Sequence, residues 1–329
     1  MTKEIAILLP YKEKYSEDQA GAASIWVKDY LKLSKLRDKT LVYGNLNPKF
    51  SPITNNFKNI NLNNLLIKKN LQYTKKFYEY CVKKKHKIIE IHNRPESLNY
   101  FFDKNINNRF KLIFIFHNNP LELRGSKTVE QRLSLIKNTD FIFFVSEWVK
   151  NKFFDGITYK ERNNCEVLYP SIEPINKINK NKNKTIIFTG KLNSSKGYDI
   201  FLSAIEKILN KYVEWNAVAV GNEPREKYDI NHERLKVYNW KKHSEILKLY
   251  DKSSISVVPS KWDEPFGRTA MESAAYGCAT ITSNNGGLSE TFKNELFFIN
   301  PTSKTIKFSI ENKNYKLKPN CSLLVEIKL

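Results

Sequence analysis

Short apolar runs alternate with longer amphipathic segments along most of this chain of 329 residues. The runs are rich in Ile, Val and Phe, and between them apolar residues recur at the spacing of a helix face. This alternation predicts parallel sheets that are covered by helices on both faces. The predicted strands are 4–11, 40–45, 87–93, 110–118, 141–146, 165–170, 185–190, 216–222, 235–239, 255–260 and 279–284. The predicted helices are 22–34, 65–84, 129–138, 198–212, 244–253 and a short one within 259–277.

One polar segment, 171–184, interrupts the alternation with repeated Lys and Asn and few apolar side chains other than Ile. Such a composition is typical of a linker. The chain is also longer than the roughly 250–300 residues at which single cores stop growing. We therefore predict an α/β protein of two Rossmann-like domains, 1–172 and 173–329, with parallel sheets facing a central cleft. Ligands of such sheets bind beyond the carboxyl ends of the strands.

The composition narrows the class of protein. The net charge is +21, and residues 51–100 hold ten Lys and Arg against three Asp and Glu. This charge fits nucleic acid, anionic lipid or phosphorylated substrates, but joint enrichment in Lys, Asn and Ile fits a general compositional bias equally well. The four cysteines lack zinc-site spacing, and no apolar run reaches about 18 residues. We predict a cytoplasmic protein with reduced thiols.

The stretch PSKWDEPFGRTAMESAAYG, residues 259–277, holds the strongest candidate chemistry. Its loop leads through Gly267 into a helix, and free N–H groups at a helix start attract an anion. Glu264 in the loop and Glu272 in the helix would each accept hydrogen bonds from ligand hydroxyls, an arrangement that suits a nucleotide sugar. The competing interpretation is structural, because Thr269 and Glu272 have the spacing of a capping box.

A longer stretch, PSKWDEPFGRTAMESAAYGCATITSNNGGLSE, resembles the signature of family 4 of the glycosyltransferases. In that signature two glutamates are separated by seven residues and followed by a Gly-Gly turn and a further Glu. The segments FTGKLNSSKGYDIFLSAI, FVSEWVKNKF, EIHNRP and FIFHNNP resemble other parts of the family, so the resemblance runs unevenly from residue 4 to about 300. It implies a GT-B fold whose second domain binds the nucleotide-sugar donor and whose first domain binds the acceptor.

The resemblance also implies roles for individual residues. The catalytic set is Glu264, beside the transferred sugar, with His117 and Lys196. The donor-binding set is Lys191, Gly190, Phe266, Gly267, Arg268, Thr269, Glu272, Asn239 and Trp240. The acceptor side or phosphate loop consists of Gly21, Ala22, His92 and Arg94. The alternative to these functional roles is structural: the lysines would be solvated surface side chains, and the histidines would be hydrogen-bonded residues at a sheet edge.

The resemblance implies transfer of a sugar from a nucleotide-diphosphate donor to a hydroxyl acceptor with retention of anomeric configuration. We predict that the donor is a UDP-sugar. Negative charge develops on the leaving diphosphate, where the two lysines and the helix dipole would stabilise it. The chain contains no D-x-D sequence. We therefore predict that the reaction needs neither a metal nor another cofactor.

The predicted helix 65–84 carries six lysines among aromatic and aliphatic residues. Such a helix would dock on the anionic inner face of a membrane and present a lipid-linked, lipopolysaccharide or polysaccharide acceptor. The alternative is a helix that packs on its own sheet with its lysines in water. Residues 305–329 are typical of alternating strands rather than of the helices with which the family usually ends.

Two other functions stay open at this point. A nucleotide-sugar epimerase shares the fold, but it requires further acids and histidines that the sequence does not locate. A non-catalytic basic module would bind nucleic acid or an anionic polymer. This chain is rich in Lys rather than Arg and shows no RNA-binding motif, so we predict no nucleic-acid partner.

Overall fold

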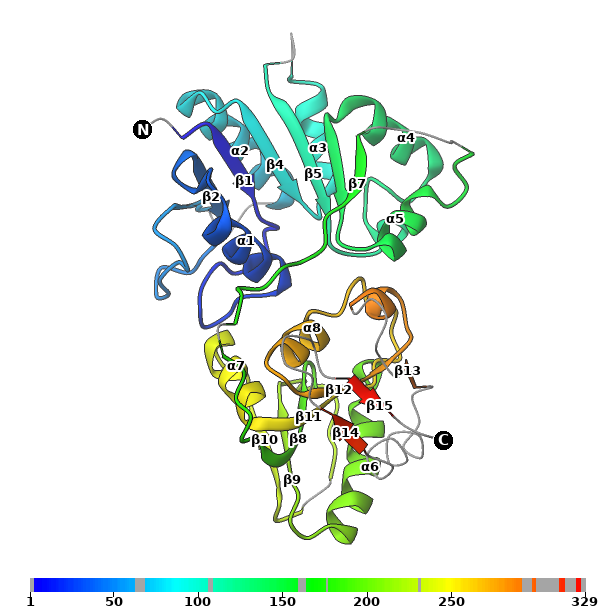
Figure 1. The fold of residues 1–329 in the computed structure, drawn as a ribbon. Helices are drawn as coiled ribbons and strands as arrows, with labels where there is room; N and C mark the ends of the chain where they lie inside the picture. The colour runs from blue at the N-terminus through cyan, green and yellow to red at the C-terminus, as the bar shows by residue number, and fades with distance from the viewer. Residues whose placement is uncertain are drawn as a thin grey trace. The chain divides into compact units, whose positions relative to one another are not determined.

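The computed structural model describes residues 3–62, 69–105, 109–158, 164–175, 177–229 and 232–291, and the strands Phe298–Ile299, Asn314–Lys316 and Leu324–Glu326. The chain divides into two compact units, Met1–Glu173 (unit 1) and Pro174–Leu329 (unit 2). Each unit is built on its own parallel sheet (Figure 1). The predicted α/β class with two parallel sheets is confirmed.

The sheet of unit 1 has seven strands in the order β3-β2-β1-β4-β5-β6-β7, and all neighbouring pairs are parallel. Its order reverses between β1 and β4. The loops that follow these two strands therefore leave in opposite directions, and ligands of open α/β sheets bind at such a point. The strands are β1 (Ile5–Leu8), β2 (Thr40–Gly44), β3 (Phe57–Asn59), β4 (Ile88–His92), β5 (Lys111–Phe116), β6 (Phe141–Phe144) and β7 (Cys165–Val167).

Helices cover both faces of this sheet. Trp26 and Leu31 of α1 pack against Ile7 on one face. On the opposite face Phe77 of α2 meets Tyr43, with ring centroids 5.1 Å apart. The helices are α1 (Ala22–Leu33), α2 (Lys69–Lys84), α3 (Pro95–Phe102), α4 (Val129–Asn138) and α5 (Glu147–Phe154).

The sheet of unit 2 is also parallel, in the order β10-β9-β8-β11-β12-β13, and its order reverses between β8 and β11. The α6 helix packs on one face through residues such as Phe201 and Ile205, and α7 packs on the other through Tyr250. The elements are β8 (Asn183–Thr189), α6 (Tyr198–Lys211), β9 (Asn216–Val220), β10 (Leu235–Tyr238), α7 (His243–Lys252), β11 (Ser253–Val258), α8 (Arg268–Ala275), β12 (Ala279–Ser283) and β13 (Phe298–Ile299).

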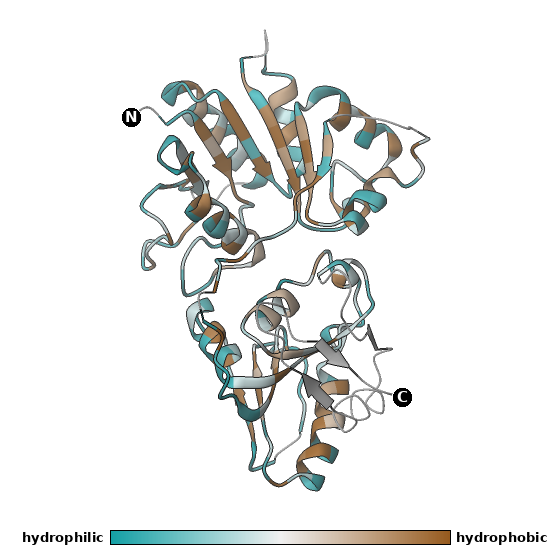
Figure 2. Cartoon of the chain, viewed as in Figure 1, coloured by the Kyte–Doolittle hydropathy of each residue, from teal (hydrophilic) through white to brown (hydrophobic). Residues whose placement is uncertain are grey.

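Hydropathy follows these layers. The strands of both sheets are largely apolar, whereas the helices show one apolar and one polar side (Figure 2). Burial of the strands on both faces explains why the sequence presents them as continuous apolar runs rather than as an alternating pattern.

Several elements differ from the predictions. The helix predicted over 65–84 is observed as α2 from Lys69, and residues 65–68 lie outside the described part of the chain. The α3 and α5 helices and the short β3 strand were not predicted. Of the segment 305–329 only β14 (Asn314–Lys316) and β15 (Leu324–Glu326) are described, and they form an antiparallel pair. None of the described helices is long and apolar enough to cross a membrane.

The α2 helix turns its aromatic residues inward. Tyr73, Phe77 and Cys81 are buried, whereas Lys75 and Lys83 are exposed. Of the apolar side chains that the membrane-docking hypothesis assigned to lipid, Phe77 is buried in unit 1 and Tyr78 and Tyr80 are half-buried, whereas Leu71 is exposed. Leu65 and Leu66 lie outside the described residues. This arrangement favours the alternative of a helix packed on its own sheet.

Candidate functional site

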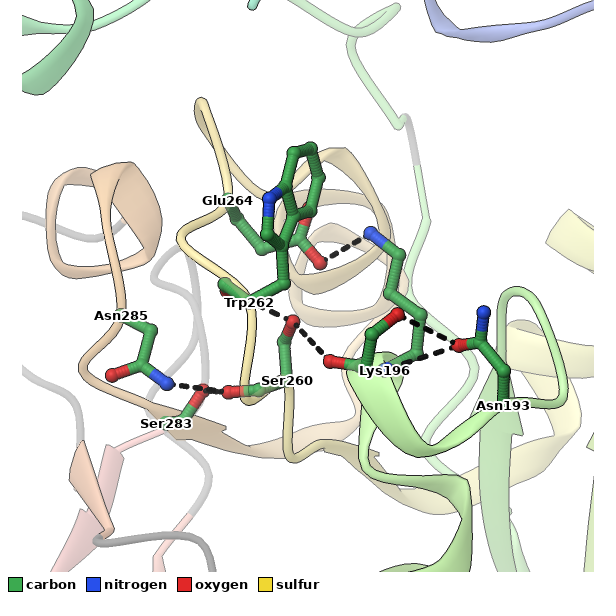
Figure 3. A network of polar contacts seen from close by, with 8 residues as sticks. Asn193, Lys196, Ser260, Trp262, Glu264, Ser283 and Asn285 are labelled. Carbon is green, nitrogen blue, oxygen red and sulfur yellow. Dashed lines mark hydrogen bonds and ion pairs between the residues drawn. The ribbon is translucent and has the colours of Figure 1, made fainter. Parts of the chain in front are cut away.

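Two loops meet at the carboxyl edge of the unit 2 sheet, where the strand order reverses. One follows β8 and spans 190–197, and the other follows β11 and spans 259–267. The backbone amides of Lys261 and Trp262 both donate to the carbonyl of Ser195, at 2.9 and 3.1 Å. Asn193 in turn accepts a hydrogen bond from the amide of Lys196 at 3.1 Å. The two loops are therefore held together through their main chains (Figure 3).

An ion pair joins the two residues that the sequence predicted as catalytic in this unit. Lys196 Nζ lies 2.5 Å from Glu264 Oε1, and the Glu264 side chain is only 12% exposed. The same ammonium lies 4.6 Å from the ring centroid of Trp262, within the range of a cation–π interaction. Figure 3 shows the carboxylate, the ammonium and the indole gathered at one end of the two loops.

The backbone of Glu264 is fixed by the Gly-Gly turn that the sequence signature contains. Glu264 and Gly286 form a β-bridge, and the amide of Gly287 donates to the carbonyl of Glu264 at 2.6 Å. Gly286 has φ of 65°, and a Cβ there would lie 2.3 Å from the same carbonyl oxygen. Only glycine fits this position, so the turn serves to place the glutamate.

Two further side chains tie the turn to the loop after β11. Ser283 Oγ and Asn285 Nδ2 both donate to the carbonyl of Ser260, at 2.6 and 2.7 Å (Figure 3). Ser260 Oγ donates in turn to the carbonyl of Trp262 at 3.0 Å. The loop that carries Glu264 is therefore anchored on both sides.

The α8 helix begins at Arg268, with Gly267 as its N-cap and no capping side chain. Thr269 is consequently the second helical residue, and Glu272 lies beyond the first turn. The interpretation of these two residues as a capping box is wrong. Gly267 has φ of 120°, and a Cβ there would lie 2.4 Å from Leu288 Cδ2, so the entry to the helix also requires glycine.

Glu272 is instead the centre of a buried charge cluster. It is 4% exposed, and its Oε1 lies 2.9 Å from His243 Nε2 and 2.6 Å from Arg268 Nε. Burial acts to raise the pKa of Glu272, but the hydrogen bond from His243 and the charge of Arg268 together hold it below its ordinary value. His243, at the first position of α7, was not among the predicted site residues.

The remaining predicted donor residues are less closely connected to this cluster. Lys191 is exposed and adds to the effect of Arg225, whose hydrogen bond lowers the pKa of Glu223 to about 2. Asn239 and Trp240 follow β10 and are exposed. Within the described residues, no hydrogen bond or ion pair connects these last two to the glutamates. Gly190 has φ of 146° and open space beside it, and Phe266 is buried.

Unit 1 carries a different polar group at the carboxyl edge of its sheet. His92 Nδ1 lies 2.8 Å from His117 Nε2, and His92 Nε2 lies 2.7 Å from Glu90 Oε1. His92 is fully buried and Glu90 is 5% exposed. The two predicted histidines are thus brought together, and a carboxylate that was not predicted joins them.

The other predicted residues of unit 1 surround two separate features. Arg94 and His92 line one small pocket, together with Leu9 and Tyr11, at the reversal between β1 and β4. Gly21 is the N-cap of α1 and Ala22 is its first residue. Glu13 accepts a hydrogen bond from the amide of Ser24 at 3.0 Å in the first turn of this helix. A phosphate at this helix start would therefore compete with an internal carboxylate.

A family model described as "Glycosyl transferases group 1" matches residues 171–314, which cover most of unit 2. The chain is 23% identical over 240 residues to the putative glycosyltransferase YtcC of Bacillus subtilis, a match that covers 64% of this chain and 58% of YtcC. The chain spans about half the length of the curated relatives that it matches.

Solved structures are similar over almost the whole chain. Anabaena Alr3699/HepE, in complex with UDP-glucose, gives a TM-score of 0.71 at 16% identity over 93% of this chain and 88% of its own. Starch synthase IV of Arabidopsis thaliana, bound to ADP and acarbose, gives 0.66 at 12% identity over 93% and 90%. At this level of identity the similarity shows the fold, which is the GT-B fold that the sequence predicted.

Proposed function

Because the chain belongs to the group 1 glycosyl transferases through residues 171–314, we propose that it moves a sugar from a nucleotide diphosphate to a hydroxyl acceptor. The observation that carries this proposal is the Lys196–Glu264 pair, which stands at the strand-order reversal of unit 2. Family membership supports the reaction class, and the geometry of this pair supports the assignment of residues.

In this proposal the two glutamates bind hydroxyls and the cations bind phosphate. Glu264 accepts hydrogen bonds from the transferred sugar, and Glu272 accepts them from the ribose. Lys196 and Lys191 bind the diphosphate, together with the backbone N–H groups at Phe266, Gly267 and Arg268 near the start of α8. A cation and a helix N-terminus both stabilise the charge that develops on the leaving phosphate.

In this arrangement Lys196 takes part both in binding the donor and in controlling the carboxylate that acts on the sugar. Lys196 forms an ion pair with Glu264. When a bound diphosphate attracts the ammonium, the Glu264 carboxylate is released and can accept hydrogen bonds from the sugar. The sugar gains positive character as its bond to the phosphate breaks, and a nearby carboxylate stabilises that charge. We propose retention of configuration, the general outcome in this family, with His117 beside the reacting sugar.

The proposed donor is a UDP-sugar, a choice supported by the UDP-glucose in the HepE complex. Starch synthase IV was solved with ADP, so the fold alone does not select the base. Calorimetry against UDP, GDP and ADP tests the choice directly. We expect tightest binding of UDP, and equal binding of all three nucleotides would contradict it.

The proposed acceptor is a lipid-linked or polysaccharide-type carbohydrate. The exposed lysines of α2 support an electrostatic attraction to anionic lipid, worth about 1 kcal/mol for each cation near the surface, without insertion of aromatic side chains. Flotation of the whole protein with vesicles that contain or lack phosphatidylglycerol tests this attraction. Equal recovery with both vesicles would remove the membrane from the proposal.

The reaction class is tested by incubation with a UDP-sugar alone and then with acceptors. Transfer predicts slow release of UDP and free sugar without acceptor, whereas an epimerase would return a nucleotide sugar of altered configuration. Within the described residues, no group of three His, Cys, Asp or Glu side chains is placed to hold a metal ion. Metal independence remains a proposal, and unchanged turnover in excess EDTA is its expected result.

A further inference from the structure

The loop that follows β9 in unit 2, residues 221–229, contacts the turn that carries Lys196. Glu226 Oε2 in this loop accepts a hydrogen bond from the amide of Ser194 at 2.8 Å, and Glu226 Oε1 lies 3.5 Å from Ser194 Oγ. Ser194 is the first residue of the short 3-10 turn Ser194–Lys196. The position of this turn therefore depends on a carboxylate that comes from a different loop.

The Glu226 carboxylate is itself tied to the core of unit 2. Tyr228 Oη donates a hydrogen bond to Glu226 Oε2 at 2.5 Å. The Tyr228 ring packs edge-on against the buried Tyr198, with ring centroids 5.1 Å apart. The hydrogen bond from Tyr228, followed by that from the Ser194 amide, lowers the pKa of Glu226 below its ordinary value. Glu226 is thus an ionised acceptor whose place is fixed by a core tyrosine.

A second carboxylate shapes the same loop. Arg225 Nε and Nη2 donate to Oε1 and Oε2 of Glu223 at 2.6 and 2.7 Å. Glu223 is buried, whereas Pro224 and Lys227 on the outer side of the loop are exposed. The loop therefore has one outer side in water and one inner side that presents Glu226 to the turn.

The main chain of the turn is directed at acceptors within the protein. The amide of Lys196 donates to Asn193 Oδ1 at 3.1 Å (Figure 3), and the amide of Gly197 donates to the carbonyl of Ser194 at 3.0 Å. Together with the Ser194 amide on Glu226, these contacts leave the side chain of Lys196 as the cationic group that the turn offers. A lysine binds phosphate as a single charge at the end of a flexible stem, so its effect depends on where the backbone holds it.

The opposite side of the turn is held by the loop after β11. The carbonyl of Ser195 accepts hydrogen bonds from the amides of Lys261 and Trp262. Glu226 holds the first amide of the turn, at Ser194. Loss of the Glu226 carboxylate would therefore loosen the beginning of the turn and leave its contacts with the loop after β11 in place.

We propose that Glu226 is a positioning residue for Lys196, because it holds the turn 194–196 so that the ammonium stands where the donor diphosphate binds. Glu226 acts through Ser194 and does not itself touch the donor. The role of Lys196 as a ligand of the diphosphate rests on the proposed function.

Electrostatics alone predicts the opposite effect on binding. A carboxylate near a diphosphate repels it, so removal of the Glu226 charge would strengthen the binding of an anion. Positioning predicts weaker binding when the acceptor oxygen is lost. The two effects separate in a pair of variants, since Glu226→Gln loses the charge but keeps an acceptor oxygen, whereas Glu226→Ala loses both.

Calorimetry of the whole protein with inorganic pyrophosphate, and then with UDP, tests the proposal. We expect the Kd for both ligands to be about fivefold higher in Glu226→Ala than in wild type, which corresponds to the loss of one hydrogen bond to a charged group. In Glu226→Gln the Kd should be no higher than in wild type. Asp229→Ala removes an exposed carboxylate from the same loop, and this matched control should bind as wild type.

A double-mutant cycle shows whether Glu226 acts through Lys196. In a Lys196→Met background, Glu226→Ala should change the Kd for UDP by less than about twofold, because no ammonium remains to be positioned. A carboxylate with a merely structural role would have the same effect in both backgrounds.

The outcomes separate this proposal from the proposed function. If Glu226→Ala binds pyrophosphate as tightly as Glu226→Gln, or has the same effect with and without Lys196, the positioning role is refuted. The expected affinities in a protein that transfers no sugar would support the positioning role and refute the proposed function. A wild-type protein that binds neither ligand would refute both. If Glu226→Ala fails to fold, Tyr228→Phe, alone and combined with Lys196→Met, gives the same decision.

Discussion

The buried carboxylates near the carboxyl edges of the two sheets contact different kinds of side chain. In unit 2, Glu264 lies against Lys196 and Glu272 lies against Arg268, with His243 as a second partner of Glu272. In unit 1, Glu90 contacts a histidine, which in turn contacts a second histidine. Both edges lie at a reversal of strand order, so their topology is the same and only the partner chemistry differs.

This difference teaches what each edge is suited to do. Fixed cations suit a ligand of fixed negative charge, and a diphosphate is such a ligand. Histidines exchange protons near neutral pH, so a histidine chain suits hydroxyl groups whose protons must be oriented or moved. A donor side and an acceptor side are what the proposed reaction requires.

The largest effect is expected from Glu264→Gln, which removes the carboxylate from the edge built on fixed charge. We expect kcat to fall on the order of a hundred- to a thousandfold, because the developing charge on the sugar loses its nearest anion. Initial rates with a UDP-sugar measure the loss. The neighbouring exposed Asp263→Asn is the matched control, and an equal loss in both variants would remove the special role of Glu264.

A smaller effect is expected from Lys196→Met, which removes the cation and leaves Glu264 without this partner. We expect the Kd for UDP to rise at least tenfold, about 1.4 kcal/mol. The affinity of the variant should also depend less on ionic strength. Calorimetry at two salt concentrations measures both quantities. Lys207→Met, on the exposed side of α6, should change neither, and similar losses in the two variants would argue for a general effect of charge.

The substitution Glu272→Gln tests what the buried charge cluster contributes to the free energy of unfolding. Because the folded pKa of Glu272 is lower than its ordinary value of 4.5, its charge stabilises the fold above that value, and this contribution is lost as pH falls further. We expect the variant to lose about 3 kcal/mol at pH 7 and less below pH 4. Urea unfolding at both pH values measures the difference.

The exposed Glu206→Gln in α6 is the control for this measurement and should stay within about 0.5 kcal/mol of wild type. A Glu272→Gln variant as stable as wild type at pH 7 would show that the cluster exists for ligand binding alone. A raised donor KM would then be its main consequence.

The smallest effect is expected from the surface of unit 1. The double substitution Lys75→Gln and Lys83→Gln removes two exposed charges from α2, and we expect a change in unfolding free energy of less than about 0.5 kcal/mol. Urea unfolding at pH 7 measures it. If the unfolding free energy fell as much as in Glu272→Gln, the result would contradict the expectation that buried charges contribute more to stability than exposed ones.

Most of the fold was accessible from the sequence because buried parallel strands are continuous apolar runs. The missed helices are short and open with weak signals. Arg94-Pro95 resembles a turn although Pro is favoured at the first helical position, and α5 is marked only by the Ser146 N-cap, whose Oγ accepts from the amide of Val149. The three residues of β3 are too few for a pattern.

The site was accessible only in part. The two glutamates of unit 2 follow from their place after a strand, and Arg268 lies only four residues before Glu272. Two other partners lie far away in sequence, Lys196 from Glu264 and His243 from Glu272. Such pairings depend on tertiary packing and leave no local pattern. Glu90 did leave a signal, since a Glu and a His at alternate positions within an otherwise apolar strand put two polar groups on one buried face. The capping-box interpretation failed because Gly267 starts α8 earlier than Thr269 would.

The β-bridge between Glu264 and Gly286 fixes the position of the Glu264 backbone independently of the side chains in this loop. Its main-chain contacts locate the acid whatever side chain stands at the exposed Asp263, whereas the Trp262 ring lies against Lys196 and Lys261 pairs with Asp199. Substitution at Asp263 is therefore expected to leave the glutamate in place. A scaffold of this kind can acquire new sugar preferences through substitutions that leave its reactive carboxylate where it was.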